Sequence, residues 1–231
     1  MTWLRTVWLI PLLALSSGVV SYAQSEHRKH NFTVGLGAAM PNIDLHPDSG
    51  LPFSDNGIGP VGSLFSNTVV LGVEYGYRFH RYFQADVGLD TAFGAADIRD
   101  YLSTQFGDLR IRDYQFMLPL GGRVVVPIAD ERVLFSAGGG GAYLRYSERI
   151  RQPFGNSGFR LDCPVCASRG GWGYYGLVGL NVALDRGRHF RLGATSRIYR
   201  ADTDGDPFGP IPARRTRDEW INILGTFSFT F

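Results

Sequence analysis

The last twelve residues, Trp220 to Phe231, read WINILGTFSFTF and decide the fold. From Ile221 onward every second residue is large and apolar except Gly225, and mostly polar residues fill the gaps. This two-residue period predicts a β-strand with one apolar and one polar face. At the edge of a soluble sheet such a strand would invite aggregation. In a closed barrel within a bilayer, lipid solvates the apolar face and closure removes the edge.

The final strand also resembles the C-terminal assembly signal of outer-membrane β-barrel proteins. In that signal a glycine is followed by alternating aromatic residues and a terminal phenylalanine. The resemblance is carried by Asn222, Gly225, Phe227, Phe229 and Phe231. It implies that the barrel assembly machinery is a partner of this chain.

The composition fits one domain with a membrane-facing surface. The chain has 231 residues and a net charge of +2, a balance that gives no reason to expect nucleic acid as a partner. Aromatic residues make up 13% of the chain and can supply lipid-facing and interfacial bulk. No stretch after the first 23 residues is apolar for long enough to form a membrane-spanning helix, so a membrane protein of this sequence must be a barrel.

The N-terminus has the pattern of a signal peptide over residues 1–23. Arg5 precedes an apolar stretch, and Ser21-Tyr22-Ala23 forms a small-x-small cleavage site. A cysteine does not follow the cleavage site, so a lipid anchor is not expected. We expect a polar tail over residues 24–31 and the barrel over residues 32–231.

Seven further stretches upstream of the terminal strand are predicted to be strands. The clearest, residues 68–79, alternates Val69, Leu71 and Val73 with residues such as Gly72 and Glu74. The predicted strands are 32–40, 68–79, 82–93, 113–127, 133–146, 172–184 and 190–199. Their connections alternate between long and short, which is the layout of an outer-membrane barrel with short periplasmic turns and long outer loops.

The predicted fold is therefore all-β, an eight-stranded antiparallel up-and-down transmembrane β-barrel. As a whole, the chain from residue 32 resembles the small OmpA/OmpX-like barrels, without the peptidoglycan-binding domain that some of them carry. The resemblance implies location in the cell outer membrane, with outer-membrane lipid and lipopolysaccharide as its surroundings. We expect a monomer.

Charged residues occupy several of the predicted inward positions. This lumen charge network comprises Glu74, Arg78, Asp86, Asp90, Arg123, Arg191 and Arg197. An eight-stranded barrel is only just wide enough for side chains to fill. We therefore expect these charges to pair and plug the lumen, and a narrow or gated ion path is the alternative.

Two cysteines and three aspartates lie in predicted long loops. Cys163 and Cys166 are expected to form a local disulfide after export, since the surrounding sequence lacks the βαβ setting of a redox pair. Asp202, Asp204 and Asp206 resemble part of a calcium loop without its bidentate glutamate, and a solvated acidic turn is the simpler interpretation. No metal or cofactor is expected.

Other predicted outer residues could contact lipopolysaccharide or the membrane interface. Arginines could bind lipopolysaccharide phosphates in a bidentate manner, although they could equally be solvated loop charges. These arginines are Arg149, Arg151, Arg160, Arg169, Arg214, Arg215 and Arg217. The residues expected to form aromatic girdles are Tyr75, Tyr77, Tyr82, Phe83, Tyr143, Trp172, Tyr174 and Tyr175.

The function predicted from these features is structural or surface-interacting: envelope integrity, adhesion, or capture of an unknown extracellular ligand by the long loops. An enzyme is not predicted, because His80 and His189 fall at short turns and His46 has no evident nucleophile beside it. Two alternatives remain open. One is a small ion or solute channel, and the other is a secreted lipocalin-like binder of small molecules.

Overall fold

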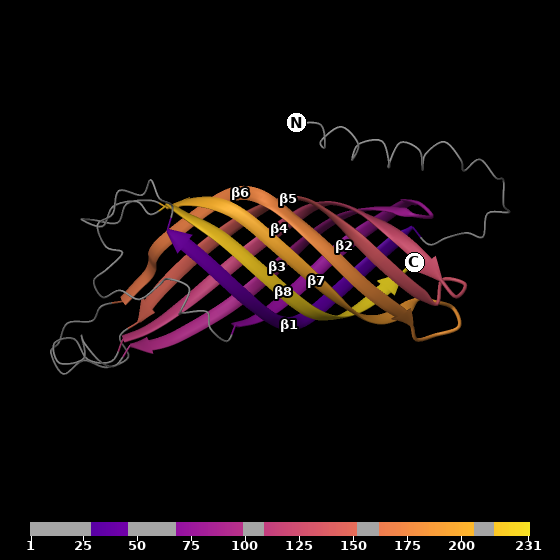
Figure 1. Ribbon diagram of the computed structural model, residues 1–231. Coiled ribbons are helices and arrows are strands. Elements are labelled where there is room, and N and C mark those ends of the chain that lie inside the picture. Colours follow the sequence, from indigo (N-terminus) through magenta and orange to yellow (C-terminus); the bar gives the residue numbers. More distant parts are fainter. Residues whose placement is uncertain (1–28, 46–67, 99–108, 152–161, 206–214) are drawn as a thin grey trace, which may run out of the picture.

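The computed structural model describes residues 29–45, 68–98, 109–151, 162–205 and 215–231, and these form one closed barrel. Each strand pairs antiparallel with the next, and β8 pairs with β1 (Figure 1). The strands are β1 His30–Leu45, β2 Thr68–His80, β3 Phe83–Ile98, β4 Leu109–Ile128, β5 Val133–Arg151, β6 Asp162–Ala183, β7 Phe190–Gly205 and β8 Arg215–Thr230. The predicted eight-stranded up-and-down barrel is confirmed.

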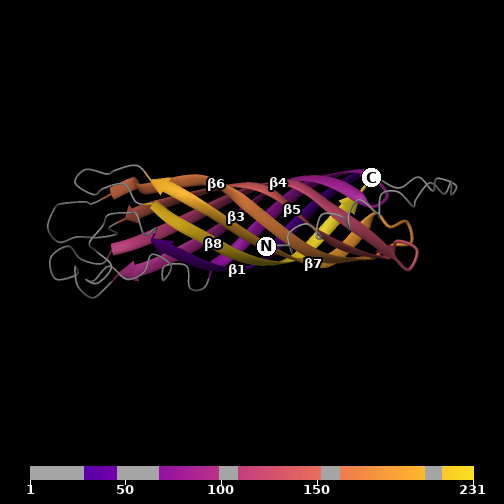
Figure 2. The same cartoon turned by 45° about the horizontal axis from the view of Figure 1, so that its top comes forward.

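One end of the barrel carries the short turns, and we call it the short-turn end. These turns join β2 to β3, β4 to β5, and β6 to β7 (Figures 1 and 2). The first and last strands meet there too, since the His30 amide donates to the Phe231 carbonyl at 3.0 Å and the Phe231 amide donates back at 3.0 Å. We call the opposite end, where the longer connections leave the strands, the long-loop end.

The outer face of the barrel is mainly apolar, whereas the lumen holds the buried charged residues together with a smaller apolar cluster. Along β2, buried and exposed residues alternate from Thr68 to Phe79. Val73 is 43% exposed on the outer face, whereas Glu74 beside it is 4% exposed in the lumen. A soluble barrel would show the reverse pattern, so the alternative of a secreted lipocalin-like binder is wrong. Within the described residues, no helix is long and apolar enough to cross a membrane.

The strands extend further toward the long-loop end than the sequence predicted. β7 continues past Tyr199 to Gly205, and β8 begins at Arg215. The added residues are held by outward ion pairs between the two strands: Arg200–Glu219 at 3.2 Å, Arg217–Asp202 at 3.3 Å and Arg215–Asp204 at 3.2 Å. Because the outer face is charged here, hydrophobic alternation no longer marks the strand.

This extension corrects the calcium-loop candidate. Asp202 and Asp204 lie on the outer face of a regular strand, where each carboxylate faces an arginine of β8. Carboxylates spaced along a strand and paired with arginines do not wrap around a cation. Asp206 lies outside the described residues. Among the described residues, no group of three or more His, Cys, Asp or Glu is placed to hold a metal ion.

Candidate functional site

The centre of the lumen is organised around the carboxylate of Glu74. One oxygen lies 2.5 Å from Nη2 of Arg123, and the other accepts a hydrogen bond from Nη2 of Arg197. Glu74 comes from β2, Arg123 from β4 and Arg197 from β7, so the contacts cross the barrel interior. All three side chains are buried. Two guanidinium groups on one buried carboxylate offset much of the cost of removing it from water.

A second carboxylate, Asp90 on β3, extends this cluster. Arg197 donates to Asp90 Oδ1, and the Tyr199 hydroxyl and the Asn222 amide donate to Asp90 Oδ2 at 2.8 and 3.0 Å. Asp90 is fully buried. Three donors occupy most of the acceptor sites of this buried carboxylate and fix its orientation.

The third carboxylate, Asp86, lies on the short-turn side of the cluster. Nε of Arg123 donates to Asp86 Oδ2 at 2.6 Å, and the Gln84 amide donates to Asp86 Oδ1 at 2.6 Å. We call the set Glu74, Asp86, Asp90, Arg123 and Arg197 the plug. Its three carboxylates and two guanidinium groups leave a formal charge of −1. The neutral donors Gln84, Tyr199 and Asn222 complete it.

The plug contains five of the seven residues predicted for the lumen network. Arg78 and Arg191 are buried but lie toward the short-turn end, where Arg191 donates to the Glu131 carbonyl at 2.9 Å. Sequence reasoning placed the acids and arginines on the inner face but did not find their neutral partners. Tyr199 follows Arg197 by two residues on β7, so both side chains face the same side of the strand. This spacing alone could have predicted that Tyr199 points into the lumen.

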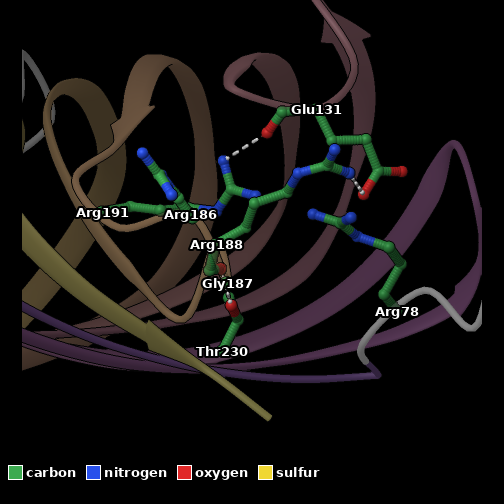
Figure 3. Close-up of a pocket in the computed structure, with 7 residues that line it drawn as sticks. All are labelled: Arg78, Glu131, Arg186, Gly187, Arg188, Arg191 and Thr230. Atoms are coloured by element: carbon green, nitrogen blue, oxygen red, sulfur yellow. Dashed lines mark hydrogen bonds and ion pairs between the residues drawn. The ribbon is translucent and has the colours of Figure 1, made fainter.

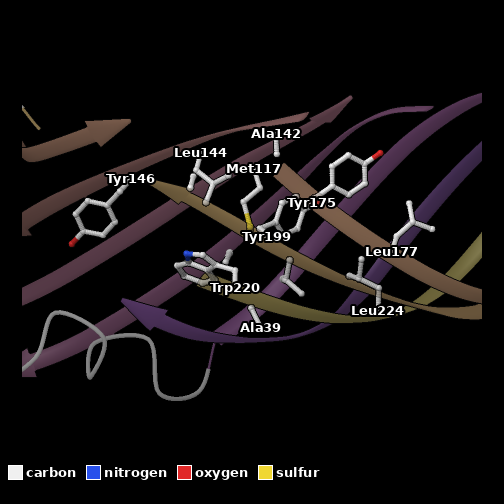
Figure 4. Packing of buried hydrophobic residues seen from close by; sticks show 13 residues of the cluster. Ala39, Met117, Ala142, Leu144, Tyr146, Tyr175, Leu177, Tyr199, Trp220 and Leu224 are labelled. Atoms are coloured by element: carbon white, nitrogen blue, oxygen red, sulfur yellow. The ribbon is translucent and has the colours of Figure 1, made fainter. Parts of the chain in front are cut away.

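Apolar and aromatic side chains pack around the plug in the lumen. Trp220, Met117 and Leu224 are buried there, and the rings of Tyr175 and Tyr199 stack with centroids 5.8 Å apart (Figure 4). Tyr175 was expected in an outer aromatic girdle, and this expectation is wrong. Trp172 and Tyr174 are exposed on β6, and Tyr175 faces inward as the next residue of the strand.

One of the arginines expected to contact lipopolysaccharide is not on the outer face, so that expectation is wrong for it. Arg169 lies inside the barrel, 3.4 Å from Asp218, with its guanidinium carbon 3.9 Å from the centre of the Tyr146 ring. Arg215 and Arg217 face outward in ion pairs, and Arg149 is exposed. The side chain of Arg151 and all of Arg160 and Arg214 lie outside the described residues.

The proposed assembly signal divides between the two faces of β8. Phe227 and Phe231 are exposed on the outer face at 41% and 54%, and Phe229 contacts Phe231 with ring centroids 5.4 Å apart. Gly225 shares this face, whereas Asn222 points inward to Asp90. Asn222 therefore has a structural role in the plug. Recognition by the assembly machinery stays a prediction.

The two cysteines were expected in a loop, but their backbone belongs to β6. The pairing of β5 with β6 shifts there, since Glu148 pairs with Ala167 while Ile150 pairs with Cys163. Three residues of β6, including Cys166, are thus accommodated opposite one residue of β5. The cysteine side chains lie outside the described residues, so the disulfide stays a prediction.

The described histidines at the short turns make local contacts. Nδ1 of His189 lies 3.1 Å from Asp185, and the same carboxylate accepts from the Phe190 amide at 2.9 Å. The Phe190 hydrogen bond, followed by that of His189, lowers the pKa of Asp185 to about 2. Nδ1 of His80 accepts from the Tyr82 amide at 3.3 Å. These contacts stabilise turns.

Comparison with known proteins places this architecture in a family. Residues 10–210 match the family model for the outer membrane protein beta-barrel domain. The search of curated proteins gave no match. Among solved structures, the chain is similar to the outer membrane protein OprG of Pseudomonas aeruginosa, at 14% identity over 89% of this chain and 97% of that one, with a TM-score of 0.52.

Two further similar structures have lower TM-scores. Neisserial surface protein A is 10% identical over 87% of this chain and 97% of its own, with a TM-score of 0.49. The outer membrane protease OmpT of Escherichia coli is 9% identical over 94% of this chain and 100% of its own, with a TM-score of 0.39. At such low sequence identity, a shared fold is no evidence that two proteins have the same activity. The closed eight-stranded barrel and the match over residues 10–210 show that this chain belongs to the outer membrane protein beta-barrel domain family and resides in the outer membrane.

Proposed function

We propose that the protein is a closed barrel with a structural or surface-interaction role, and that it does not conduct ions or solutes. The observation that supports this proposal is the plug, whose side chains come from β2, β3, β4 and β7 and meet in the lumen. Asn222 adds a contact from β8. A passing ion would have to separate buried, hydrogen-bonded charge pairs, and leaving either partner unpaired there is strongly unfavourable.

The long-loop end supports the proposed structural or surface-interaction role. There β7 and β8 continue with a charged outer face, and three ion pairs join the two strands. Loops carried by such strands are suited to binding a ligand outside the cell. The exposed Arg149, together with Arg215 and Arg217, supplies guanidinium groups that could contact lipopolysaccharide phosphates at the rim.

Solute flux tests the closed lumen. Proteoliposomes containing the protein should swell in isotonic solutions of small sugars or amino acids no faster than protein-free liposomes. Gel mobility before and after boiling in detergent verifies that the barrel is folded in the same preparation. Swelling that rises with the amount of folded protein would instead support the solute-channel alternative.

Lipopolysaccharide binding tests the rim. A variant with Arg149, Arg215 and Arg217 all changed to glutamine should bind purified lipopolysaccharide more weakly than the wild type. Arg132→Gln is the matched control, since Arg132 is exposed at the opposite, short-turn end. Equal binding by the wild type and both variants would remove lipopolysaccharide from the proposed partners of these residues.

A further inference from the structure

The mouth of the barrel at the short-turn end contains a cavity of about 190 Å³ that is rich in arginine (Figure 3). The lining residues are Arg78, Glu131, Arg186, Gly187, Arg188, Arg191 and Thr230. Among these lining residues, four guanidinium groups accompany one carboxylate, a formal excess of three positive charges. This cavity is separate from the plug, and it opens toward the periplasm if the short turns lie there as in other outer-membrane barrels.

Glu131, the acidic residue among those that line the cavity, already contacts two of the arginines. The Glu131 carboxylate lies 4.0 Å from Nη1 of Arg188, and the Glu131 carbonyl accepts a hydrogen bond from Nη1 of Arg191. The Thr230 hydroxyl donates to the Arg188 carbonyl at 2.8 Å. These contacts hold the two turns and the end of β8 in place around the cavity.

Arg78 is the residue that points to a ligand. It reaches toward the cavity from β2, on the side opposite Arg186 and Arg191 (Figure 3). The residue is only 6% exposed, and its buried Nε has no hydrogen-bond partner. It also lines a smaller adjoining cavity with Arg123 and Arg191, which places three guanidinium groups around that space. A buried guanidinium nitrogen without a hydrogen-bond partner is unfavourable, and an oxygen of a bound anion would offset that cost by accepting from it.

The size and donor geometry indicate the chemical class of this anion. The cavity is larger than one water molecule requires and smaller than a typical site for a drug-sized ligand. Guanidinium groups bind carboxylate and phosphate oxygens through paired N–H donors. A carboxylate offers two oxygens, whereas a phosphate group offers three or four and can meet arginines that approach from β2, β7 and the β6–β7 turn together.

We propose that this mouth is a binding site for a phosphate group, either free inorganic phosphate or the phosphate of a lipid headgroup. Arg78 and Arg191 form its buried floor, and Arg186 and Arg188 form its outer wall. Glu131 limits the affinity by repelling the ligand while it holds Arg188 and Arg191 in position. This proposal does not depend on whether the lumen of the barrel conducts ions.

Binding can be measured directly on the protein purified in a detergent without phosphate. Titration with inorganic phosphate at low ionic strength, followed by calorimetry and ³¹P NMR, should show saturable binding that weakens as sodium chloride is added. Arg78→Gln should weaken binding about tenfold or more, because it removes a buried guanidinium. Glu131→Gln should tighten binding about threefold, because it removes a competing charge. Arg132→Gln should leave binding unchanged.

Competition distinguishes the two sources of phosphate. If short-chain phosphatidylglycerol below its micellar concentration displaces inorganic phosphate, the site accepts a lipid phosphodiester. If it does not, the free dianion is the ligand. Heat-dependent gel mobility establishes that each variant is folded. The proposal is wrong if the folded wild type shows no saturable phosphate binding, or if Arg132→Gln weakens binding as much as Arg78→Gln.

Discussion

Nη2 of Arg123 lies 2.5 Å from Oε1 of Glu74, and both side chains are buried in the lumen. Because Glu74 also accepts from Arg197, it is the only carboxylate of the plug that contacts both plug arginines. Glu74→Gln would leave two buried cations without their shared counter-charge. We expect it to lower the free energy of unfolding by about 3 kcal/mol.

Urea-induced unfolding in detergent or lipid vesicles measures this effect. Glu219→Gln is the control, since Glu219 forms an ion pair with Arg200 that is partly exposed on the outer face. Exposed pairs contribute little, so this change should cost less than about 1 kcal/mol. If both variants lower the free energy of unfolding equally, the buried ion pairs of Glu74 contribute no more to stability than the exposed pair of Glu219.

Close packing of β5 against β4 holds Arg123 in place. A Cβ added at Gly138 would lie 2.2 Å from the Gly122 carbonyl and 2.6 Å from Cβ of Arg123. Gly138→Ala should therefore destabilise the barrel by about 2 kcal/mol or prevent it from folding. Gly141→Ala, in the same glycine run, is the control, because its Cβ would come no closer than 4.0 Å to Gly173 O. Heat-dependent gel mobility and urea unfolding compare the two, and equal tolerance would contradict this packing argument.

Substitutions on the inner and outer faces of β8 should affect different properties: the inner face the stability of the barrel, and the outer face its assembly in cells. Asn222→Ala removes a donor from buried Asp90 and should lower the free energy of unfolding by about 1 to 3 kcal/mol. Phe231→Ala removes an outward ring that stacks on Phe229 and His30, so it should lower the free energy of unfolding by only about 1 kcal/mol while slowing assembly in cells. Unfolding of purified protein and pulse-chase assembly in cells give the two readouts. Normal assembly of Phe231→Ala would remove the terminal phenylalanine from the signal.

The β6–β7 turn should respond to strongly acidic pH. The pKa of Asp185 is lowered from 3.8 to about 2, chiefly by the hydrogen bond from the Phe190 amide. A lowered pKa means that the ionised carboxylate stabilises the turn fully above about pH 3.8, and that this contribution is lost as the pH falls toward 2. The Phe190 amide resonance in micelles should titrate near pH 2 and stop titrating in Asp185→Asn. Titration near pH 4 would contradict the hydrogen bond.

The sequence predicted the fold because the signal was strong where the barrel meets lipid. From Thr68 to Phe79 and from Ile221 to Phe231, outward residues that are mostly large and apolar alternate with inward residues that are mostly small or polar, and this period predicts both the strand and its faces. The signal ended where the outer face became charged, as at Asp202 and Arg217. For this reason hydrophobic alternation predicts a loop between Tyr199 and Trp220, whereas both ends of this charged segment continue β7 and β8.

The sequence predicts which charged residues point into the lumen, but it does not predict which of them pair. Strand parity placed Glu74 and Arg197 on the inner face, but the pairing between them depends on strand stagger and barrel closure, which local sequence does not encode. The same limit explains Arg169, whose charge suggested an outer contact and whose partner Asp218 comes from another strand. Asn222 belongs to the stretch that resembles an assembly signal, and its hydrogen bond to Asp90 has no local signal in the sequence because the two residues are 132 positions apart.

Single-channel recording in planar bilayers tests the closed lumen most directly. The folded wild type should give no large, stable conductance. The double variant Arg123→Ala with Arg197→Ala removes both guanidinium groups that bridge Glu74, Asp86 and Asp90, and should admit water and cations to the lumen as a measurable conductance. A large, stable conductance from the wild type, equal to that of the double variant, would contradict the plug and establish an open pore.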